Sequence, residues 1–429
     1  MSGKFQDQLK ELLDNKVITK DVALSISDYY KRNEDNSSSK LFVVFGIIGA
    51  ILASLGIILV FAHNWDEMSR FSKCVVSFLP LVVGQLFCGY ALFSKNDSPA
   101  WKESSASFLF FAVGATISLV AQTYNIAGDF ANFIFTWMIL GLPLVYLMKS
   151  NIVSLLYLIG ITIYGINTNY FYYSEPHNYT YWLLLIGIAP HYYRLIKAEA
   201  TNFGAIHNWF IPTSIAICLG SINNKGSGGN DLLYFSYTFL FGCFYFIGKT
   251  SFFKSDKLLS NGFSIVGKLG GLYMLYLASF RWLWEDIGKE YFDYSSILTI
   301  VSVALFILAI VLFFYIRKLK TVTLNEILQY SFLIIGLCYF ISKGSVIVPV
   351  FICNLYLLMI GIREIQKGNA EGSIARLNFG VLLITILIVC RFFDTEMSFI
   401  VRGTLFILVG VGFFGLNYYL LKNKKKDEK

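Results

Sequence analysis

The sequence predicts an all-α fold, a polytopic bundle of transmembrane helices with a small pair of cytoplasmic helices at the N-terminus. About fourteen apolar runs, most of them roughly 17 to 24 residues long, fill the chain almost from end to end. A helix of about 20 such residues crosses a ~30 Å hydrocarbon core. The composition agrees, because 56% of the residues are hydrophobic and 14% are charged, with a mean hydropathy of +0.61.

The first 36 residues form a separate domain in this interpretation. Apolar residues recur with helical spacing in two short stretches between residues 4 and 32, first around Leu9 and Leu12 and then around Val22 and Ile26. Each stretch is too short to form a stable helix alone in water, so we expect a helical hairpin. This hairpin is either a solvated cytoplasmic appendage or a site for a cytoplasmic protein partner. The polar start of the chain also predicts that no signal peptide is cleaved.

The transmembrane bundle is predicted over residues 37–421 and is followed by a basic tail, residues 422–429. The expected spans are 41–63, 73–94, 106–124, 131–148, 152–169, 181–197, 209–221, 232–249, 262–280, 295–316, 324–342, 345–362, 374–392 and 399–421. A count of 12 is the alternative if two weak runs do not span. The seventh run is short and contains Pro212, which favours a broken or re-entrant helix.

The distribution of Lys and Arg predicts the orientation. With both termini in the cytoplasm, 27 of the 35 Lys and Arg residues fall on the cytoplasmic side and 8 on the outer side. Cytoplasmic segments of membrane proteins carry an excess of these residues. The positive net charge of +8 therefore reflects membrane orientation and does not indicate nucleic-acid binding.

Aromatic residues are abundant, with 27 Tyr and 40 Phe. Clusters such as Phe171-Tyr172-Tyr173 and the pair Trp282 and Trp284 lie at predicted membrane interfaces. An aromatic belt is the ordinary interpretation. An aromatic platform for a sugar or a lipid head group is the alternative.

Polar residues inside or next to apolar runs are the candidates for a polar cavity or binding site, because they are costly in lipid. They form four groups along the chain. These are His63, Asn64, Trp65 and Asp66; then Gln85, Gln122, Tyr124, Asp129 and Trp137; then Arg281; and finally Asn354, Arg363, Glu364, Arg391 and Asp394. Each group also has a structural interpretation, as a helix cap, as a hydrogen bond between helices or as a local salt bridge. We expect Gln122 to face the bundle interior, near Gln85 or near the outer-end cluster of Asn64, Asp66 and Asp129.

Catalytic and metal-binding patterns are missing from the sequence. There is no nucleotide-binding Gly-Lys-Ser/Thr loop, no His-Glu-x-x-His and no Gly-x-Ser-x-Gly. The 7 Cys lie in or beside apolar runs without CxxC spacing, so we interpret them as small buried residues. Gly267-x-x-x-Gly271 is interpreted as a helix-packing motif. We therefore expect no cofactor and no metal, and the sequence does not favour an enzyme.

The order of several motifs resembles a known family. Ala62-His63-Asn64-Trp65-Asp66 closes a Gly-rich first run, and Gly114 to Gln122, Gly128-Asp129 and Trp137 follow. Over residues 5–150 this order is similar to the bacterial membrane-protein family called domain of unknown function 2157. Gly361 to Glu364 and Arg391 to Asp394 resemble its C-terminal part more loosely. The resemblance implies a multi-pass protein of the bacterial inner membrane and implies no activity.

Three functions remain open from the sequence. The first is a transporter or flippase-like protein that moves a small or lipid-linked substrate, suggested by the many spans and the polar residues at depth. The second is a scaffold or assembly factor without transport, whose N-terminal helices bind a cytoplasmic partner. The third is a membrane enzyme acting on a lipid-linked substrate. The lipid bilayer is the one partner that all three share, and the substrate is unknown.

Overall fold

The computed structural model describes the chain as helices. It describes residues 68–171, 179–197, 201–222, 230–250, 261–287, 296–319 and 326–394, with scattered residues between 11 and 59 and between 400 and 415. Within these residues every regular element is a helix, as the sequence predicts. The chain divides into two compact units: unit 1 is Met1–Phe171 with Thr180–Tyr193, and unit 2 is Tyr172–Tyr179 with Arg194–Lys429.

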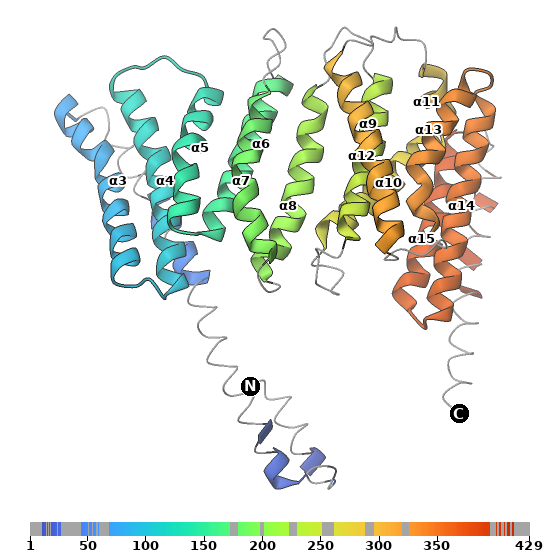
Figure 1. The fold of residues 1–429 in the computed structure, drawn as a ribbon, viewed down its shortest axis with the longest axis horizontal. Helices are drawn as coiled ribbons and strands as arrows, with labels where there is room; N and C mark the ends of the chain where they lie inside the picture. Colours follow the sequence, from blue (N-terminus) through green and yellow to red (C-terminus); the bar gives the residue numbers. More distant parts are fainter. Residues whose placement is uncertain are drawn as a thin grey trace. The chain divides into compact units, whose positions relative to one another are not determined.

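Unit 1 contains consecutive helices that pack against their neighbours (Figure 1). They are α3 (Arg70–Phe93), α4 (Pro99–Thr123), α5 (Phe130–Leu147), α6 (Asn151–Ile166) with a π-helical extension (Asn167–Phe171), and most of α7 (Thr180–Lys197). Side-chain caps fix several starts, because Ser69, Asp129 and Ser150 each accept a hydrogen bond from a backbone amide three residues later.

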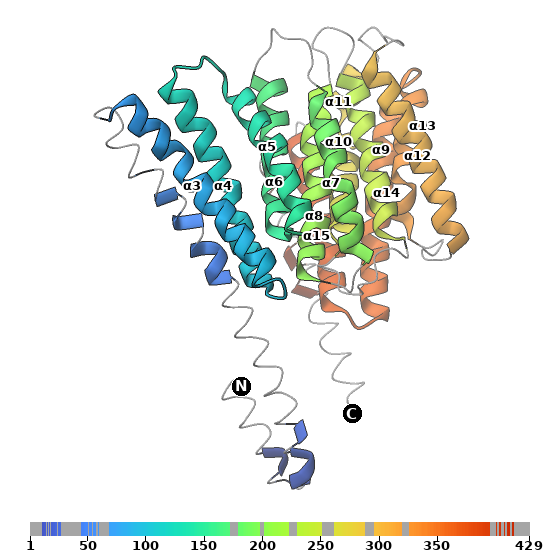
Figure 2. The same ribbon diagram turned by 60° about the vertical axis from the view of Figure 1, so that its left-hand side comes forward.

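Unit 2 contains the remaining helices (Figure 2). They are α8 (Asn202–Leu219), α9 (Asn230–Gly248), α10 (Gly262–Ala278), α11 (Arg281–Asp286), α12 (Ile297–Leu319), α13 (Ser331–Ser342), α14 (Ile347–Ala370) and α15 (Ile374–Asp394). A 3-10 turn (Ile327–Tyr330) leads into α13 and another (Gly220–Ile222) follows α8. Helix α9 packs against α10 and α12, and α14 packs against α13 and α15.

Nine helices in the described part of the chain are long and apolar enough to cross a membrane. Gly262–Ala278 and Ile327–Ser342 are shorter apolar helices. Each predicted span from 73–94 to 374–392 contains a helix, so the multi-pass helical class is confirmed. The predicted total of fourteen remains a prediction. The N-terminal pair (1–36), most of the first span and most of the last span lie outside the described residues.

The predicted break at Pro212 is absent. Helix α8 runs without interruption from Asn202 to Leu219, with Pro212 inside it, and begins seven residues before the predicted run at 209. Thr201 caps its start, where its hydroxyl accepts a hydrogen bond from the amide of Gly204 at 3.1 Å. The polar residues His207 and Asn208 lower the hydropathy of the first half of α8, so the hydropathy pattern did not predict that half as part of the helix. Both are buried, and the His207 ring pairs with the carbonyl of Phe203 at 2.7 Å.

A buried carboxylate fastens α4 to α6 within unit 1. Glu103, in the first turns of α4, is 5% exposed. It accepts hydrogen bonds from the Ser150 hydroxyl and from the amides of Asn151 at 2.9 Å and Ile152 at 3.1 Å. A carboxylate at a helix N-terminus satisfies free amides and complements the helix dipole. The Asn151 side chain in turn contacts the His191 ring of α7 at 3.2 Å.

Tyrosine hydroxyls join helices in both units. Each of four buried or half-buried tyrosines donates to a backbone carbonyl of another helix: Tyr157 to Leu184 at 2.9 Å, Tyr234 to Met274 at 2.7 Å, Tyr237 to Ala216 at 2.9 Å and Tyr276 to Leu383 at 2.6 Å. Trp284, expected in an interfacial belt, is also buried at 1% exposure and donates to the carbonyl of Ala278. The belt interpretation is therefore wrong for Trp284, whereas Trp282 is 49% exposed.

Small residues allow close helix packing in unit 2. A Cβ atom added at Gly267 of α10 would lie 2.2 Å from the Tyr245 amide nitrogen of α9. A Cβ at Gly368 of α14 would lie 2.5 Å from the Leu377 amide nitrogen of α15. The turn between α14 and α15 contains Gly372 at φ +63°, a conformation that favours glycine. These contacts fix where the charged ends of α9, α10, α14 and α15 meet.

Candidate functional site

A cavity of ≈ 700 Å³ lies in unit 2 and is called the basic cavity below. Its lining joins the end of α9, the start of α10, the turn before α13 and the α14–α15 hairpin. Five cations and three carboxylates line it: Lys249, Lys268, Arg363, Lys367 and Arg376, with Glu326, Glu364 and Glu371. Apolar side chains complete the wall: Trp209, Ile265, Leu269, Ile327, Leu328, Ile360, Ala375 and Phe379. The volume is in the range of small-molecule sites.

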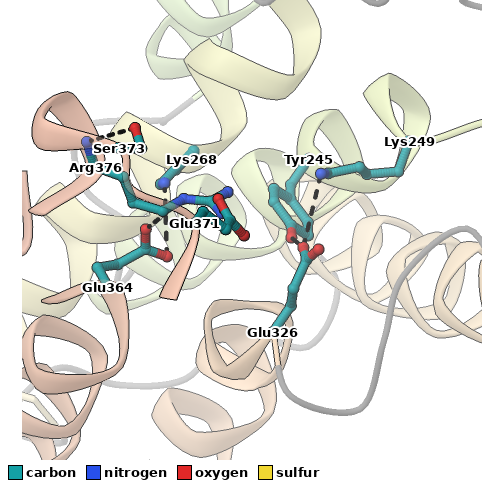
Figure 3. A network of polar contacts seen from close by, with 8 residues as sticks. All are labelled: Tyr245, Lys249, Lys268, Glu326, Glu364, Glu371, Ser373 and Arg376. Atoms are coloured by element: carbon teal, nitrogen blue, oxygen red, sulfur yellow. Dashed lines mark hydrogen bonds and ion pairs between the residues drawn. The ribbon is translucent and has the colours of Figure 1, made fainter. Parts of the chain in front are cut away.

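One carboxylate of the basic cavity, Glu326, is held from α9 (Figure 3). The Tyr245 hydroxyl donates to its Oε2 at 2.6 Å, and the Lys249 ammonium lies 3.6 Å from the same oxygen. Tyr245 and Lys249 are four residues apart on one helix face, so a single helical turn supplies both partners.

The second carboxylate, Glu364, lies between two cations (Figure 3). Its Oε1 is 3.9 Å from the Lys268 ammonium, and its Oε2 is 3.5 Å from Nε of Arg376. Both distances exceed those of ordinary charge-assisted hydrogen bonds, and Oε2 is buried without a hydrogen-bond partner. Arg376 donates instead to both oxygens of Glu371. Lys268 therefore has a loose partner, and its ammonium also lies 4.4 Å from the centre of the Phe379 ring.

The remaining two cations of the lining, Arg363 and Lys367, differ from Lys249, Lys268 and Arg376 in having no carboxylate partner within the described part of the chain. Among the described residues, no carboxylate lies within ion-pair distance of Arg363 or Lys367. They are four residues apart on α14, so their charges share one helix face and repel each other. The lining as a whole carries a formal charge of +2. This arrangement is suited to an anion, which would meet unpaired positive charge in a partly apolar space.

Metal binding has no comparable support in the part of the chain that the structure describes. No group of three or more His, Cys, Asp and Glu side chains is placed there to hold a metal ion. Cys338 and Cys353 lie 4.0 Å apart, sulfur to sulfur, between α13 and α14, and both are buried.

Among the first two predicted groups, none of the described residues lines the basic cavity. His63, Asn64, Trp65 and Asp66 lie outside the described residues. Gln85 and Gln122 are both exposed, so the prediction that Gln122 faces the interior is wrong. Gln122 is in the last turn of α4, where it needs no buried partner.

Three further candidates of unit 1 have structural contacts. Tyr124 is 60% exposed, and its hydroxyl lies 3.8 Å from the Cys74 sulfur. Asp129 caps α5 by accepting from the Asn132 amide at 2.7 Å. The Trp137 indole donates to the Phe110 carbonyl at 2.8 Å and packs over Gly114. The structure does not gather these three into a cavity with the glutamines.

The structure brings together two pairs of the candidates in unit 2. Arg363 and Glu364 both line the basic cavity. Asn354 and Arg391 meet at Ser279, since Asn354 donates to the Ser279 carbonyl at 3.0 Å and Arg391 to its hydroxyl at 3.1 Å.

The last two candidates are Arg281 and Asp394. Arg281 is exposed and pairs with Glu285, four residues on, at 2.6 Å. Asp394 ends α15, and its side chain lies outside the described part of the structure. Arg281 is not among the residues that line the basic cavity.

Most cavity residues were missed by the sequence reasoning. Lys268 carried the clearest signal, because it lies inside a predicted apolar span and directly follows Gly267 of the packing motif. An ionisable residue in a span is a candidate functional residue by default. Glu326, Glu371 and Arg376 resembled ordinary helix-end charges, and nothing in the local pattern joined them.

Comparisons with known proteins reach only unit 1. No curated protein and no solved structure matches the chain. The basic cavity lies outside the segment matched by a family model, residues 10–154. That segment agrees with the resemblance inferred for residues 5–150, which is thereby confirmed: residues 10–154 match the family described as a predicted membrane protein (DUF2157).

Proposed function

We propose that the protein is a transporter of the bacterial inner membrane that binds its substrate in the basic cavity. The cavity carries the proposal, because it gathers paired and unpaired charges from the ends of several apolar helices around one space of ≈ 700 Å³. Lys268 lies within the apolar helix α10, and an ionisable residue inside such a helix is by default a candidate for a pathway or a ligand site. A scaffold needs no internal charged space of this size.

The basic cavity faces the cytoplasm in this proposal. Its charged residues come from the segments around residues 249, 268 and 326 and from residues 363–376. The Lys and Arg distribution assigns these segments to the cytoplasmic side. Both termini lie on that side as well.

Translocation requires a second state of unit 2. Next to the basic cavity its interior is filled with large side chains, among them Phe246, Phe332 and Leu357, each 1% exposed. A substrate therefore passes only when the packing between α9, α10 and α13 opens, as in alternating access. The described conformation is the one open toward the proposed cytoplasmic face.

Flux from proteoliposomes tests the proposal. Vesicles are loaded with a mixed extract of small metabolites and a fluorescent phospholipid, and the retained contents and lipid distribution are measured. We expect protein-dependent loss of at least one component, reduced at least tenfold by Lys268→Gln. Lys343→Gln is the matched control, because this lysine of unit 2 does not line the basic cavity.

Two outcomes contradict transport. Transport is contradicted directly if vesicles with the wild-type protein keep the same contents and the same lipid distribution as protein-free vesicles. Equal flux from the Lys268→Gln and Lys343→Gln variants would show that any pathway lies elsewhere. The scaffold hypothesis gains in the first case, and the N-terminal residues 4–32 then become the place to look for a cytoplasmic partner.

A further inference from the structure

We infer that the basic cavity binds a phosphate-bearing anion through Lys268, Arg363 and Lys367. This inference rests on the proposed function, since it names the substrate class of the same cavity. All three carboxylates already have cationic partners. Glu326 pairs with Lys249 and Glu371 with Arg376. Glu364 lies 3.9 Å from the Lys268 ammonium and 3.5 Å from Nε of Arg376, so Lys268 is only loosely paired. Among the described residues, the formal charge of +2 on the lining therefore corresponds to Arg363 and Lys367, which have no carboxylate within ion-pair distance.

The placement of these cations favours a multivalent anion. Arg363 and Lys367 lie one helical turn apart on α14, and Lys268 reaches toward Glu364 of the same helix from α10. Two like charges on one helix face destabilise each other, and an anion between them removes that repulsion. A phosphate group offers several oxygens, so it can accept from an arginine fork and from two lysines at once.

The apolar part of the cavity wall indicates the chemistry of the part of the ligand that carries no phosphate. Eight of the lining residues are apolar, including Trp209, Ile265 and Phe379. A phosphate-bearing ligand with an apolar part fits this division. Two sources supply such chemistry: the head group of an anionic phospholipid, for which basic pockets between transmembrane helices are known sites, and a soluble phosphate compound. The phosphate is common to both.

Thermal unfolding of the purified full-length protein in neutral detergent tests the inference. The unfolding midpoint is followed at constant ionic strength while sodium phosphate, short-chain phosphatidylglycerol or short-chain phosphatidylcholine is added. A ligand that binds the folded state raises the midpoint. We expect phosphate, phosphatidylglycerol or both to raise it and phosphatidylcholine to leave it unchanged. A response to phosphatidylglycerol alone identifies the lipid source, and a response to phosphate alone identifies a soluble one. A response to both shows that the shared phosphate group is what the cavity recognises.

Matched variants locate the binding. Arg363→Gln with Lys367→Gln should weaken the response at least tenfold in concentration. Arg317→Gln with Lys318→Gln removes the same charge from the last turn of α12, outside the cavity lining, and should respond as the wild type does. If the double variant does not fold, Lys367→Gln alone takes its place, with a reduced response expected.

The inference is overturned if no phosphate compound raises the midpoint, if phosphatidylcholine acts as strongly as phosphatidylglycerol, or if the two double variants respond alike. These results are separate from flux. Phosphate binding without flux would contradict the transport function but not the anion site. Flux of an uncharged compound without any phosphate response would contradict the proposed anionic substrate but not transport.

Discussion

At the scale of single residues, Glu103 shows how unit 1 keeps a carboxylate inside an apolar bundle. Three donors from Ser150, Asn151 and Ile152 converge on it. Sequence reasoning overlooked Glu103, because a charge near the start of a helix resembles an ordinary surface residue. Its partners lie 47 to 49 positions away along the chain, which no local pattern reports. Trp137, by contrast, was a sequence candidate for a polar cavity, and its described contacts are those of packing.

The Glu103→Ala variant tests this contact. Removing the carboxylate leaves buried donors unsatisfied, which costs about 1–3 kcal/mol. We expect the thermal unfolding midpoint of the purified protein to fall clearly. Asp97→Ala, in the exposed turn just before α4, serves as the control and should leave the midpoint nearly unchanged. Equal midpoints for the two variants would mean that Glu103 contributes nothing to stability.

At the scale of elements, the helices themselves were largely predictable, since long apolar runs dictate them. Errors arose where polar side chains are satisfied inside the protein, as at the start of α8 with His207 and Asn208. The Gly267-x-x-x-Gly271 motif was correctly assigned to packing, yet its two glycines differ. A Cβ at Gly267 would collide with the backbone of α9, whereas one at Gly271 would meet nothing closer than 3.8 Å.

This difference predicts unequal effects of the same substitution. Gly267→Ala forces α9 and α10 apart and should cost about 1–3 kcal/mol, as overpacking does. Gly271→Ala should cost much less and is the control on the same helix. Chemical unfolding of both variants, each compared with the wild type, measures the difference. Comparable losses would show that close approach at Gly267 is unimportant.

At the scale of the whole molecule, the basic cavity marks the limit of sequence reasoning. Its charged residues run from Lys249 to Arg376, more than a hundred residues apart in the chain. In the sequence, each of these charges alone resembles an ordinary charged residue. The helical class and the matched family segment could be predicted, because composition, run length and motif order are local or global properties of the chain. Which charges meet depends on helix packing, which the sequence pattern does not encode directly.

Membrane orientation can be tested with two exposed turns of unit 1. The charge distribution predicts Asn96, after α3, on the cytoplasmic side and Ala127, before α5, on the outer side. Asn96→Cys should therefore resist a membrane-impermeant maleimide in intact cells, and Ala127→Cys should react. The parent protein is the control, since its native cysteines are buried or half-buried. The opposite labelling pattern would reverse the orientation and place the basic cavity on the outer face.

The contact of Glu103 also has a consequence for how the chain enters the membrane during synthesis. Helix α4 leaves the ribosome well before Ser150, Asn151 and Ile152, which cap its carboxylate. Until then Glu103 must stay hydrated at the membrane surface, because an uncapped charge is costly in hydrocarbon. The start of α4 can therefore be buried with its charge satisfied only once the first turn of α6 is in place. The matched family segment, residues 10–154, includes Glu103 and all three of these partners.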